Sequence, residues 1–430
     1  MTSRGKIVCL KTVDNDEENE RVNLSACEIA RILNICPKRV FCSDLFNGFS
    51  VKGEITDECI DKLKEAGIFV DIEEDFEVHS YMPENNPSEK QEQEQEEKEK
   101  EEERQEVQDK NEIKEEKDVD DLVNAQFFRN RSNDRNTEQI AWWTKMIGLF
   151  DSHTFQTNKD DDNAQWNDID VYILDTGLEK HPYLNVVEMK SFIEDEPEVH
   201  DMNGHGNNCG GLIGAKYRNW DKDEFIDVVG VCPNIRLFGY KVLNKDGSGS
   251  FSDIITALED IALKNKRNPE RKIVINMSLG GFVGTPFYTA LDREVVNLVN
   301  KRNVHVVIAA GNDNKDTTLY SPAKVREAFV VGSHDIRMNK SSFSNFGTSV
   351  SIFAPGTDIR TTTINNGVMV TSGTSFACPI VSGILAMILS KEEGNMTSAE
   401  LKKKFLTYAQ QKVNFVPNGT TDSYIKVDKI

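Results

Sequence analysis

The feature that most constrains the fold is a series of short, continuously apolar runs in the C-terminal two-thirds of the chain. The runs are "DIDVYILD", "RLFGYKVL", "KIVINMSL", "NVHVVIAAG" and "AFVVGS", and helix-like patterns such as "FSDIITALEDIALK" and "PFYTALDREVVNLVNK" lie between them. Apolar strands that alternate with helices are typical of a parallel sheet covered on both faces. We therefore predict an α/β domain over residues 138–430, with functional residues at the carboxyl ends of its strands.

The N-terminal domain, residues 1–82, has a different pattern. Strand-like stretches occur in "KIVCLKTV", "FNGFSVKGE" and "IFVDIEEDFEVHS". Helix-like stretches occur in "NLSACEIARILNI" and in "TDECIDKLKEAGI", where Thr56 stands near the helix N-cap. This βαββαβ-like order predicts a small α+β, ferredoxin-like domain with an antiparallel sheet.

Residues 83–137 separate the two regions and begin with a strongly acidic segment. Residues 84–121 contain 18 acidic and 7 basic residues and have no apolar face. Such a segment buries too little surface to offset its conformational entropy, so we predict an acidic, disordered linker and lead-in. A solvated spacer and an acidic docking tail are both compatible with this composition.

Composition argues against several classes of partner and location. The 430-residue chain has a formal net charge of −21 and no basic stripe, which argues against nucleic acid as a partner. No stretch approaches the run of about 18 apolar residues that a membrane span needs. The N-terminus lacks an apolar signal region, which favours an intracellular location and reduced thiols for the eight cysteines; the localisation itself stays unknown.

Four polar residues stand where strands or a helix present functional groups. Asp175 and Asn312 follow apolar runs, His205 lies between two glycines, and Ser375 precedes the apolar stretch "IVSGILAMIL". Individually they have ordinary interpretations, such as a turn-forming Asp, a loop His or an N-capping Ser. Together they supply a carboxylate, a base, an oxyanion donor and a nucleophile. Pro379 is expected in the first helical turn, where its missing N–H costs nothing.

In this order of residues, and in its motifs, the chain resembles the subtilisin-like serine proteases (subtilases, peptidase S8), with a pattern closest to the proteinase K branch. The resemblance covers residues 138–430. It rests on "DVYILDTGLEKHP", "NGHGNNCGGLIG", "LFGYKVLNKDGSG", "INMSLGG", "AAGNDN", "YSPAKV", "SSFSNFG", "IFAPGTDI" and "TSGTSFACP". Residues 1–82 resemble the family's inhibitor-like (I9) prodomain, most clearly in "FNGFSVKGEITDECIDKLKEAGIFVDIEED".

The resemblance implies roles for individual residues. Ser375 would be the nucleophile, His205 the general base and acid, and Asp175 the carboxylate that orients the imidazole. The Asn312 side chain and the Ser375 backbone N–H would form the oxyanion hole. Two edges would bind extended substrate, and they comprise Gly247, Ser248 and Gly249 on one side and Ser278, Leu279, Gly280 and Gly281 on the other.

The resemblance also implies a subtilisin-like three-layer fold, with a parallel central sheet flanked by helices. The function that follows is that of a serine endopeptidase made as a self-inhibited zymogen. Its expected partners are polypeptide substrates and its own prodomain, and a monomer is expected. The alternative is a catalytically silent binding scaffold with the same fold.

The chain departs from the family pattern at several positions. Asn207 and Asn208 replace the usual Thr-His after the catalytic His-Gly. Cys209, four residues after His205, predicts a free thiol beneath the site. No metal site is assigned, because Ser351 occupies the position where proteinase K relatives often carry a calcium-binding Asp. Calcium at another site stays possible. Three other carboxylates are left unassigned: Asp313, Asp316 and Asp335.

Two stretches are candidates for removal of the prodomain. Autocleavage near Ser80, Tyr81 and Met82 would leave the acidic segment on the mature chain, and Pro83 makes the bond after Met82 a poor substrate. Cleavage in "FFRNRSNDRN", residues 127–136, would remove the acidic segment as well.

Overall fold

The computed structural model describes residues 3–10, 29, 33, 37–42, 46–52, 55–65, 70–81, 141–158, 166–216 and 228–430. Residues Met1–Met82 and Ala141–Ile430 form one compact unit. Most of the predicted helix at 23–35, the whole acidic segment and the alternative cleavage stretch at 127–136 lie outside the described residues.

A nine-stranded sheet organises the C-terminal part of the described chain, in the order β17-β18-β14-β13-β11-β9-β5-β7-β6. Every pairing in it is parallel except that of β17 with β18. The predicted parallel sheet is therefore confirmed. Its strands are β5 (Ile169–Asp175), β6 (Asn185–Ser191), β7 (Arg236–Lys241), β9 (Lys272–Met277), β11 (His305–Ala309), β13 (Phe329–His334), β14 (Val350–Pro355), β17 (Ala409–Gln411) and β18 (Ser423–Ile425).

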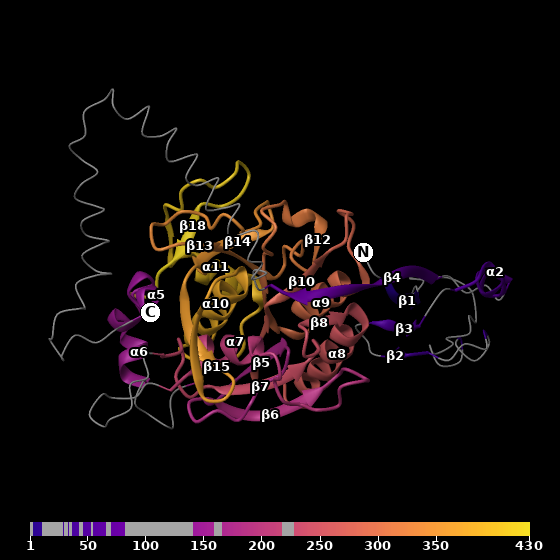
Figure 1. The fold of residues 1–430 in the computed structure, drawn as a ribbon, viewed down its shortest axis with the longest axis horizontal. Coiled ribbons are helices and arrows are strands. Elements are labelled where there is room, and N and C mark those ends of the chain that lie inside the picture. Colours follow the sequence, from indigo (N-terminus) through magenta and orange to yellow (C-terminus); the bar gives the residue numbers. More distant parts are fainter. Residues whose placement is uncertain are drawn as a thin grey trace. The chain divides into compact units, whose positions relative to one another are not determined.

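Helices cover both faces of this sheet, as the all-apolar strands require. Along β5, Val171 and Ile173 belong to one buried cluster, which also contains residues of α7 (His205–Gly214) and α10 (Thr374–Leu389). The alternate residues Tyr172 and Leu174 belong to a second cluster, with residues of α8 (Phe251–Arg267) and α9 (Ala290–Arg302). The result is the three-layer α/β fold, which can be followed in Figure 1.

The long helices begin at residues suited to capping. Ser250 caps α8 by accepting the Asp253 N–H, and Thr289 and Asp292 form a capping box at the start of α9. Helix α10 is apolar on all sides and completely buried, so it runs through the core of the molecule.

The N-terminal domain contains β1 (Ser3–Leu10), β2 (Arg39–Cys42), β3 (Asn47–Val51), α2 (Asp57–Glu65) and β4 (Val70–Ser80). The strands pair antiparallel in the order β4-β1-β3-β2, as a ferredoxin-like sheet does. Sequence analysis did not identify β2, whose four residues are too few to show a period. Thr56 lies where predicted, and its hydroxyl accepts the Cys59 N–H at 3.4 Å.

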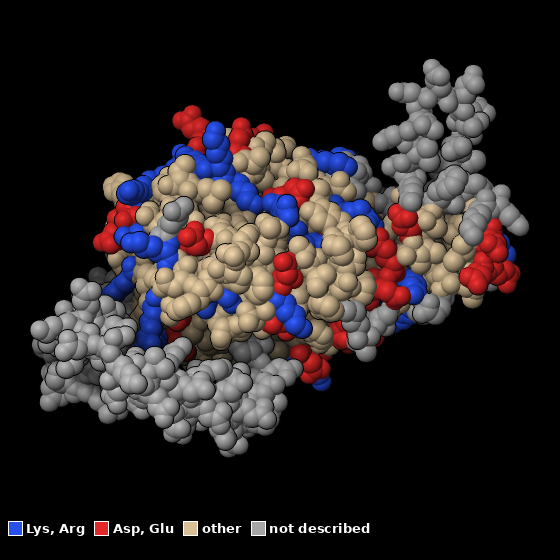
Figure 2. Space-filling model, turned by 90° about the horizontal axis from the view of Figure 1, so that it is seen from above, with Lys and Arg blue, Asp and Glu red and all other residues tan. Residues whose placement is uncertain are grey.

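The remaining elements of the described residues are short. They are α5 (Trp142–Met146), η2 (Leu149–Asp151), α6 (His153–Asn158), β8 (Ser248–Ser250), β10 (Leu279–Phe282), η3 (Thr317–Leu319), β12 (Tyr320–Ser321), β15 (Ile359–Thr363), β16 (Gly367–Thr371) and α11 (Ser398–Leu406). Among the described helices, none is long and apolar enough to cross a membrane. On the face shown in Figure 2, Lys and Arg side chains are interspersed with Asp and Glu.

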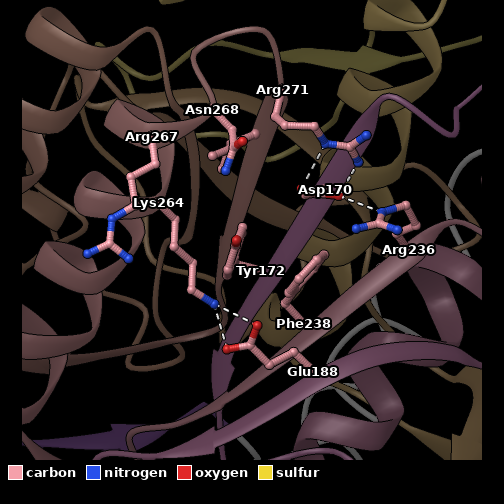
Figure 3. A pocket seen from close by; sticks show the side chains of 10 residues that line it. Asp170, Tyr172, Glu188, Arg236, Phe238, Lys264, Arg267, Asn268 and Arg271 are labelled. Atoms are coloured by element: carbon pink, nitrogen blue, oxygen red, sulfur yellow. Dashed lines mark hydrogen bonds and ion pairs between the residues drawn. The ribbon is translucent and has the colours of Figure 1, made fainter.

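A cavity of about 430 Å³ lies where β5, β7 and β9 begin (Figure 3). Its charged groups are largely paired with one another: Asp170 accepts from Arg236 and Arg271, and Glu188 accepts from Lys264. Asp170 and Asp175 stand at opposite ends of β5, about 16 Å apart at 3.3 Å per residue. The cavity is therefore remote from the carboxyl edge of the sheet, where the predicted site lies.

Candidate active site

Asp175 and His205 meet at the carboxyl edge of the sheet. Asp175 is the last residue of β5, and His205 is the first residue of α7. Both side chains are fully buried, and His205 Nδ1 lies 2.7 Å from Asp175 Oδ1. A neutral imidazole that donates its Nδ1 proton to the carboxylate carries a free lone pair on Nε2, which can then accept a proton.

Ser375 is the second residue of α10, and it is not the N-cap, which is Gly373. The ordinary interpretation of Ser375 as a capping residue is therefore wrong. Its hydroxyl lies 3.0 Å from the Tyr81 carbonyl oxygen and 3.1 Å from the Ser278 carbonyl oxygen, and its single proton is within reach of either acceptor. His205 Nε2 is buried and has no hydrogen-bond partner among the described residues, so it is available to accept a proton.

Pro379 lies inside α10 and not in its first turn, so the explanation offered from the sequence is wrong. A residue at this position would normally donate its N–H to the carbonyl four residues earlier, which is that of Ser375. The Ser375 carbonyl accepts instead from the Ser278 hydroxyl at 2.9 Å and from the Cys209 thiol at 3.5 Å. The missing helical hydrogen bond is thus replaced by two side-chain contacts that hold Ser375 in place.

Asn312 and Ser375 contact the same carbonyl oxygen. Asn312 Nδ2 donates to the Tyr81 oxygen at 2.8 Å, while its Oδ1 accepts from the Thr374 N–H at 2.9 Å and from the Thr374 hydroxyl at 2.8 Å. The two Thr374 donors fix which end of the amide faces Tyr81. The Ser375 N–H, the second predicted oxyanion donor, belongs to the first turn of α10, where amides lack a helical acceptor.

Strand β4 of the N-terminal domain lies between the two predicted substrate-binding edges. Val78 and His79 pair antiparallel with Gly249 and Ser248 of β8. On the other side, His79 and Ser80 pair with Gly280 and Leu279 of β10. The Ser80 N–H also donates to the Gly247 carbonyl at 2.9 Å. All the predicted edge residues therefore lie at or beside β4 and Tyr81, as Figure 1 shows for β4, β8 and β10.

The Tyr81 side chain fills a buried pocket next to these edges. A Cβ atom built on Gly280 would lie 2.3 Å from Tyr81 Oη, and one built on Gly311 would lie 3.3 Å from Tyr81 Cζ, so both glycines line the ring. Gly373 makes room for the backbone, because a Cβ there would lie 2.6 Å from the Tyr81 oxygen. Burial, and secondly the negative charge of Asp313, raises the pKa of Tyr81, so the phenol is neutral.

Two carboxylates of β4 bind helix N-termini in the C-terminal part of the chain. Asp75 accepts the Ser252 N–H at 2.9 Å and the Ser252 hydroxyl at 2.7 Å, at the start of α8. Glu73 accepts the Ala290 N–H at 2.7 Å, at the start of α9. A carboxylate at a helix N-terminus accepts from amides that lack a helical partner and interacts favourably with the helix dipole. Sequence analysis missed both, although the period-two spacing of these acids in "DIEEDFEVHS" was a usable signal.

Cys209 is a free, fully buried thiol, as predicted. Its sulfur lies 3.8 Å from Asp175 Oδ2. Burial, and secondly the charge of Asp175, raises the pKa of Cys209, so this thiol stays protonated. Asp175, His205 and Cys209 are close enough together to bind a metal ion, but the two ligand atoms of Asp175 and His205 already share a hydrogen bond.

The unusual residues after His205 make their own hydrogen bonds. Asn207 Oδ1 accepts the Glu179 N–H at 2.9 Å, and the carbonyls of Asn207 and Asn208 accept from Thr362 and Thr361 of β15. Both Asn side chains are buried. These contacts attach the start of α7 to the neighbouring hairpin β15–β16.

The positions considered for calcium have mostly local roles. Ser351 Oγ accepts the Val330 N–H at 3.4 Å. Asp316 caps η3, and Asp335 accepts the backbone N–H groups of Arg337 and Asn339. These contacts are typical of turns. Calcium binding stays a prediction.

The profile of the Subtilase family matches residues 167–424, and the chain belongs to this family. A cuticle-degrading protease of Metarhizium anisopliae is 38% identical over 257 residues, which cover 59% of this chain and 61% of that relative. Proteinase R of Parengyodontium album is 36% identical over 233 residues, 53% of this chain and 55% of the relative. The chain thus spans less than two thirds of the length of either. The fold also matches the crystal structure of a cold-adapted subtilisin-like serine proteinase, which is 32% identical in sequence, with a TM-score of 0.54. The match covers 62% of this chain and 90% of the proteinase chain.

For the peptidase activity proposed below, the pocket around Tyr81 predicts that Gly280→Ala discriminates against large residues before the cleaved bond. The added Cβ would overlap the end of the Tyr81 ring, and displacing bound substrate by about 1 Å can lower the rate about 100-fold. We expect kcat/KM for peptides with Tyr before the cleaved bond to fall by about this factor relative to otherwise identical peptides with Ala. An equal loss for both peptides would show that Gly280 does not line the pocket.

Proposed function

We propose that the chain is a serine endopeptidase that hydrolyses peptide bonds and is made as a self-inhibited zymogen. The observation that carries the proposal is the position of the Tyr81 carbonyl, which accepts hydrogen bonds from both Ser375 Oγ and Asn312 Nδ2. The chain in front of this carbonyl is paired as an extended strand on both sides. This is how a peptidase would hold a substrate on the acyl side of the bond it cleaves.

The proposed reaction uses the groups gathered at this site. Ser375 Oγ attacks the carbonyl carbon, and His205 Nε2 accepts the hydroxyl proton and delivers it to the leaving amine. Asp175 holds the imidazole in the required tautomer through the 2.7 Å contact with Nδ1. Asn312 Nδ2, together with the Ser375 N–H, stabilises the oxyanion. Water then hydrolyses the acyl-enzyme by the same steps, and every proton transfer uses the chain's own groups.

In this proposal residues 1–82 are the prodomain, residues 83–137 the acidic linker and lead-in, and residues 138–430 the peptidase domain. The prodomain inhibits by occupying both substrate-binding edges, and the first bond cleaved is Tyr81–Met82. Polypeptides and the prodomain are the proposed partners. A catalytically silent scaffold is disfavoured because an acceptor on His205 Nε2 and a hydroxyl on Ser375 are both retained at the occupied cleft.

Ser375→Ala tests the proposal directly. Casein hydrolysis is expected to fall by about 10⁶ in kcat, the loss known for removal of the nucleophile from subtilisin. Ser390→Ala, at the opposite end of α10, is the matched control and is expected to retain activity within a few-fold of wild type. If wild type itself does not hydrolyse casein after processing, or if Ser375→Ala retains activity within tenfold of wild type, the proposal is wrong.

Asn312→Ala is expected to lower kcat about 10²- to 10³-fold, the scale for loss of one oxyanion donor in subtilisin. Most of the loss is expected in kcat, because the donor is worth more when the carbonyl oxygen becomes negatively charged. Steady-state kinetics on a peptide with Tyr before the cleaved bond measures this. A rise in KM at unchanged kcat would assign Asn312 to substrate binding alone.

Asp75 predicts a pH dependence of the zymogen's stability. Burial, the largest cause, raises the pKa of Asp75 above its ordinary value of 3.8, against the opposing contacts with Ser252 and the charge of Lys38, while Asp253 raises it further. A group with a raised pKa contributes stability at low pH that is lost as the pH rises through its folded pKa.

The measurement is thermal unfolding of full-length Ser375→Ala, with and without the additional change Asp75→Asn, at a series of pH values that begins at 3.8 and rises through the folded pKa of Asp75. As the pH rises from 3.8 through the raised pKa, the protein that keeps Asp75 is expected to lose free energy of unfolding relative to the Asp75→Asn variant. The change per pH unit should not exceed about 1.4 kcal/mol for a single group. A relative increase with pH would mean that the helix N-terminus and Lys38 outweigh burial.

A further inference from the structure

A second buried carboxylate lies beside the predicted triad. Asp201 precedes α7, is 1% exposed and has no role in the reaction proposed above. We propose that Asp201 is a positioning residue that sets His205 relative to Asp175. The inference rests on the proposed function, because it concerns the geometry of that same site.

The Asp201 carboxylate accepts four hydrogen bonds. Oδ1 accepts from the Thr176 hydroxyl at 2.8 Å, and from the N–H groups of Asn203 at 3.0 Å and Gly204 at 2.7 Å. Oδ2 accepts the Asn207 N–H at 2.8 Å. Three of these donors lie within two residues of His205, and the fourth belongs to the residue that follows Asp175.

Thr176 joins the two sides of the site. Its hydroxyl donates to Asp201 and accepts the Gly206 N–H at 3.0 Å. One hydroxyl and one carboxylate therefore connect the neighbour of Asp175 with residues on both sides of His205. A shift of either element would break hydrogen bonds on the other.

Thr176 is also held through its carbonyl by a buried cation. Lys241 is fully buried, and its Nζ donates to the Thr176 carbonyl at 3.0 Å and to the Leu243 carbonyl at 3.1 Å. Glu196 Oε2 lies 3.3 Å from Lys241 Nζ and compensates the charge of the lysine. With its backbone fixed by Lys241, Thr176 gives Asp201 a rigid point from which to orient the start of α7.

The chemistry of the four donors specifies the ionised carboxylate. Each partner is an N–H or O–H group, so each contact needs an acceptor, and both oxygens of an ionised carboxylate act only as acceptors. An Asn side chain has the same shape but would direct its NH₂ group at one set of these donors. Asp201→Asn therefore disturbs the network with almost no change in volume.

A positioning role predicts a specific kinetic signature. The four hydrogen bonds of Asp201 go to residues around Asp175 and His205, and no described contact joins Asp201 to Tyr81 or Ser375. Substrate binding should therefore be preserved while proton transfer slows. A reacting group that is misplaced by up to about 1 Å can lower the rate about 10- to 100-fold.

The experiment compares Asp201→Asn with Asp195→Asn in the full chain. Asp195 is an exposed carboxylate between β6 and α7 and is the matched control. For processed Asp201→Asn we expect kcat to fall about 10- to 100-fold with KM within about twofold of wild type. The proton resonance of the Asp175–His205 hydrogen bond should shift in the Ser375→Ala background. Asp195→Asn should change none of these.

Thr176→Val keeps the test decisive if Asp201→Asn does not fold. This nearly isosteric change removes the hydroxyl that joins Asp201 to Gly206, and kcat should fall in the same way. Unchanged kcat and an unshifted resonance in whichever variant folds would overturn the positioning role, as would a rise in KM alone. If Ser375→Ala is inactive while Asp201→Asn is fully active, only this inference fails; if Ser375→Ala is active, the proposed function fails first.

Discussion

The hydrogen bonds to the Tyr81 carbonyl fix the register on which the arrangement of the cleft depends. With Tyr81 held by Asn312 and Ser375, Ser80 and His79 fall opposite β10, and Val78 falls opposite β8. A slip of one residue would reverse the face of every side chain in this strand. Tyr81 and Val78 would then leave their buried positions, and Glu73 and Asp75 would leave the starts of α9 and α8.

In the proposed zymogen, the same contacts would let one strand act first as inhibitor and then as substrate. Strands β8 and β10 each have an edge that pairs with β4, so the backbone supplies most of the directional contacts and places few demands on side-chain identity. The glycines at Gly280 and Gly373 keep Cβ atoms away from Tyr81. Binding is then specified mainly by the shape of the Tyr81 pocket and by the carboxylates farther back along β4.

Much of the site could be predicted because parallel-sheet geometry carries local signals over long distances. The runs before Asp175 and Asn312 are apolar on both faces, and the carboxyl ends of parallel strands meet at one edge. His205 between two glycines and Ser375 before an apolar helix were equally readable. The family resemblance supplied their roles. The structure pairs Asp175 with His205 and places Asn312 and Ser375 at the Tyr81 carbonyl.

The features that sequence analysis missed depend on partners distant in the chain. Pro379 was predicted to lie in the first helical turn, because nothing in the local sequence shows that Ser278 and Cys209 donate hydrogen bonds to the Ser375 carbonyl. Three hydrogen bonds of Asp201 are local, but its link to the neighbour of Asp175 comes from Thr176, twenty-five residues earlier, and the local sequence does not show it. Strand β2 is held mainly by pairing with β3, and four residues show no period of their own.

The central claim is that the Tyr81–Met82 bond is the enzyme's own first substrate. Intact-mass analysis of the N-terminal fragment released by freshly expressed wild-type protein tests it most directly. The account predicts one fragment that ends at Tyr81. A fragment that ends within residues 127–136, with the Tyr81–Met82 bond intact, would contradict it.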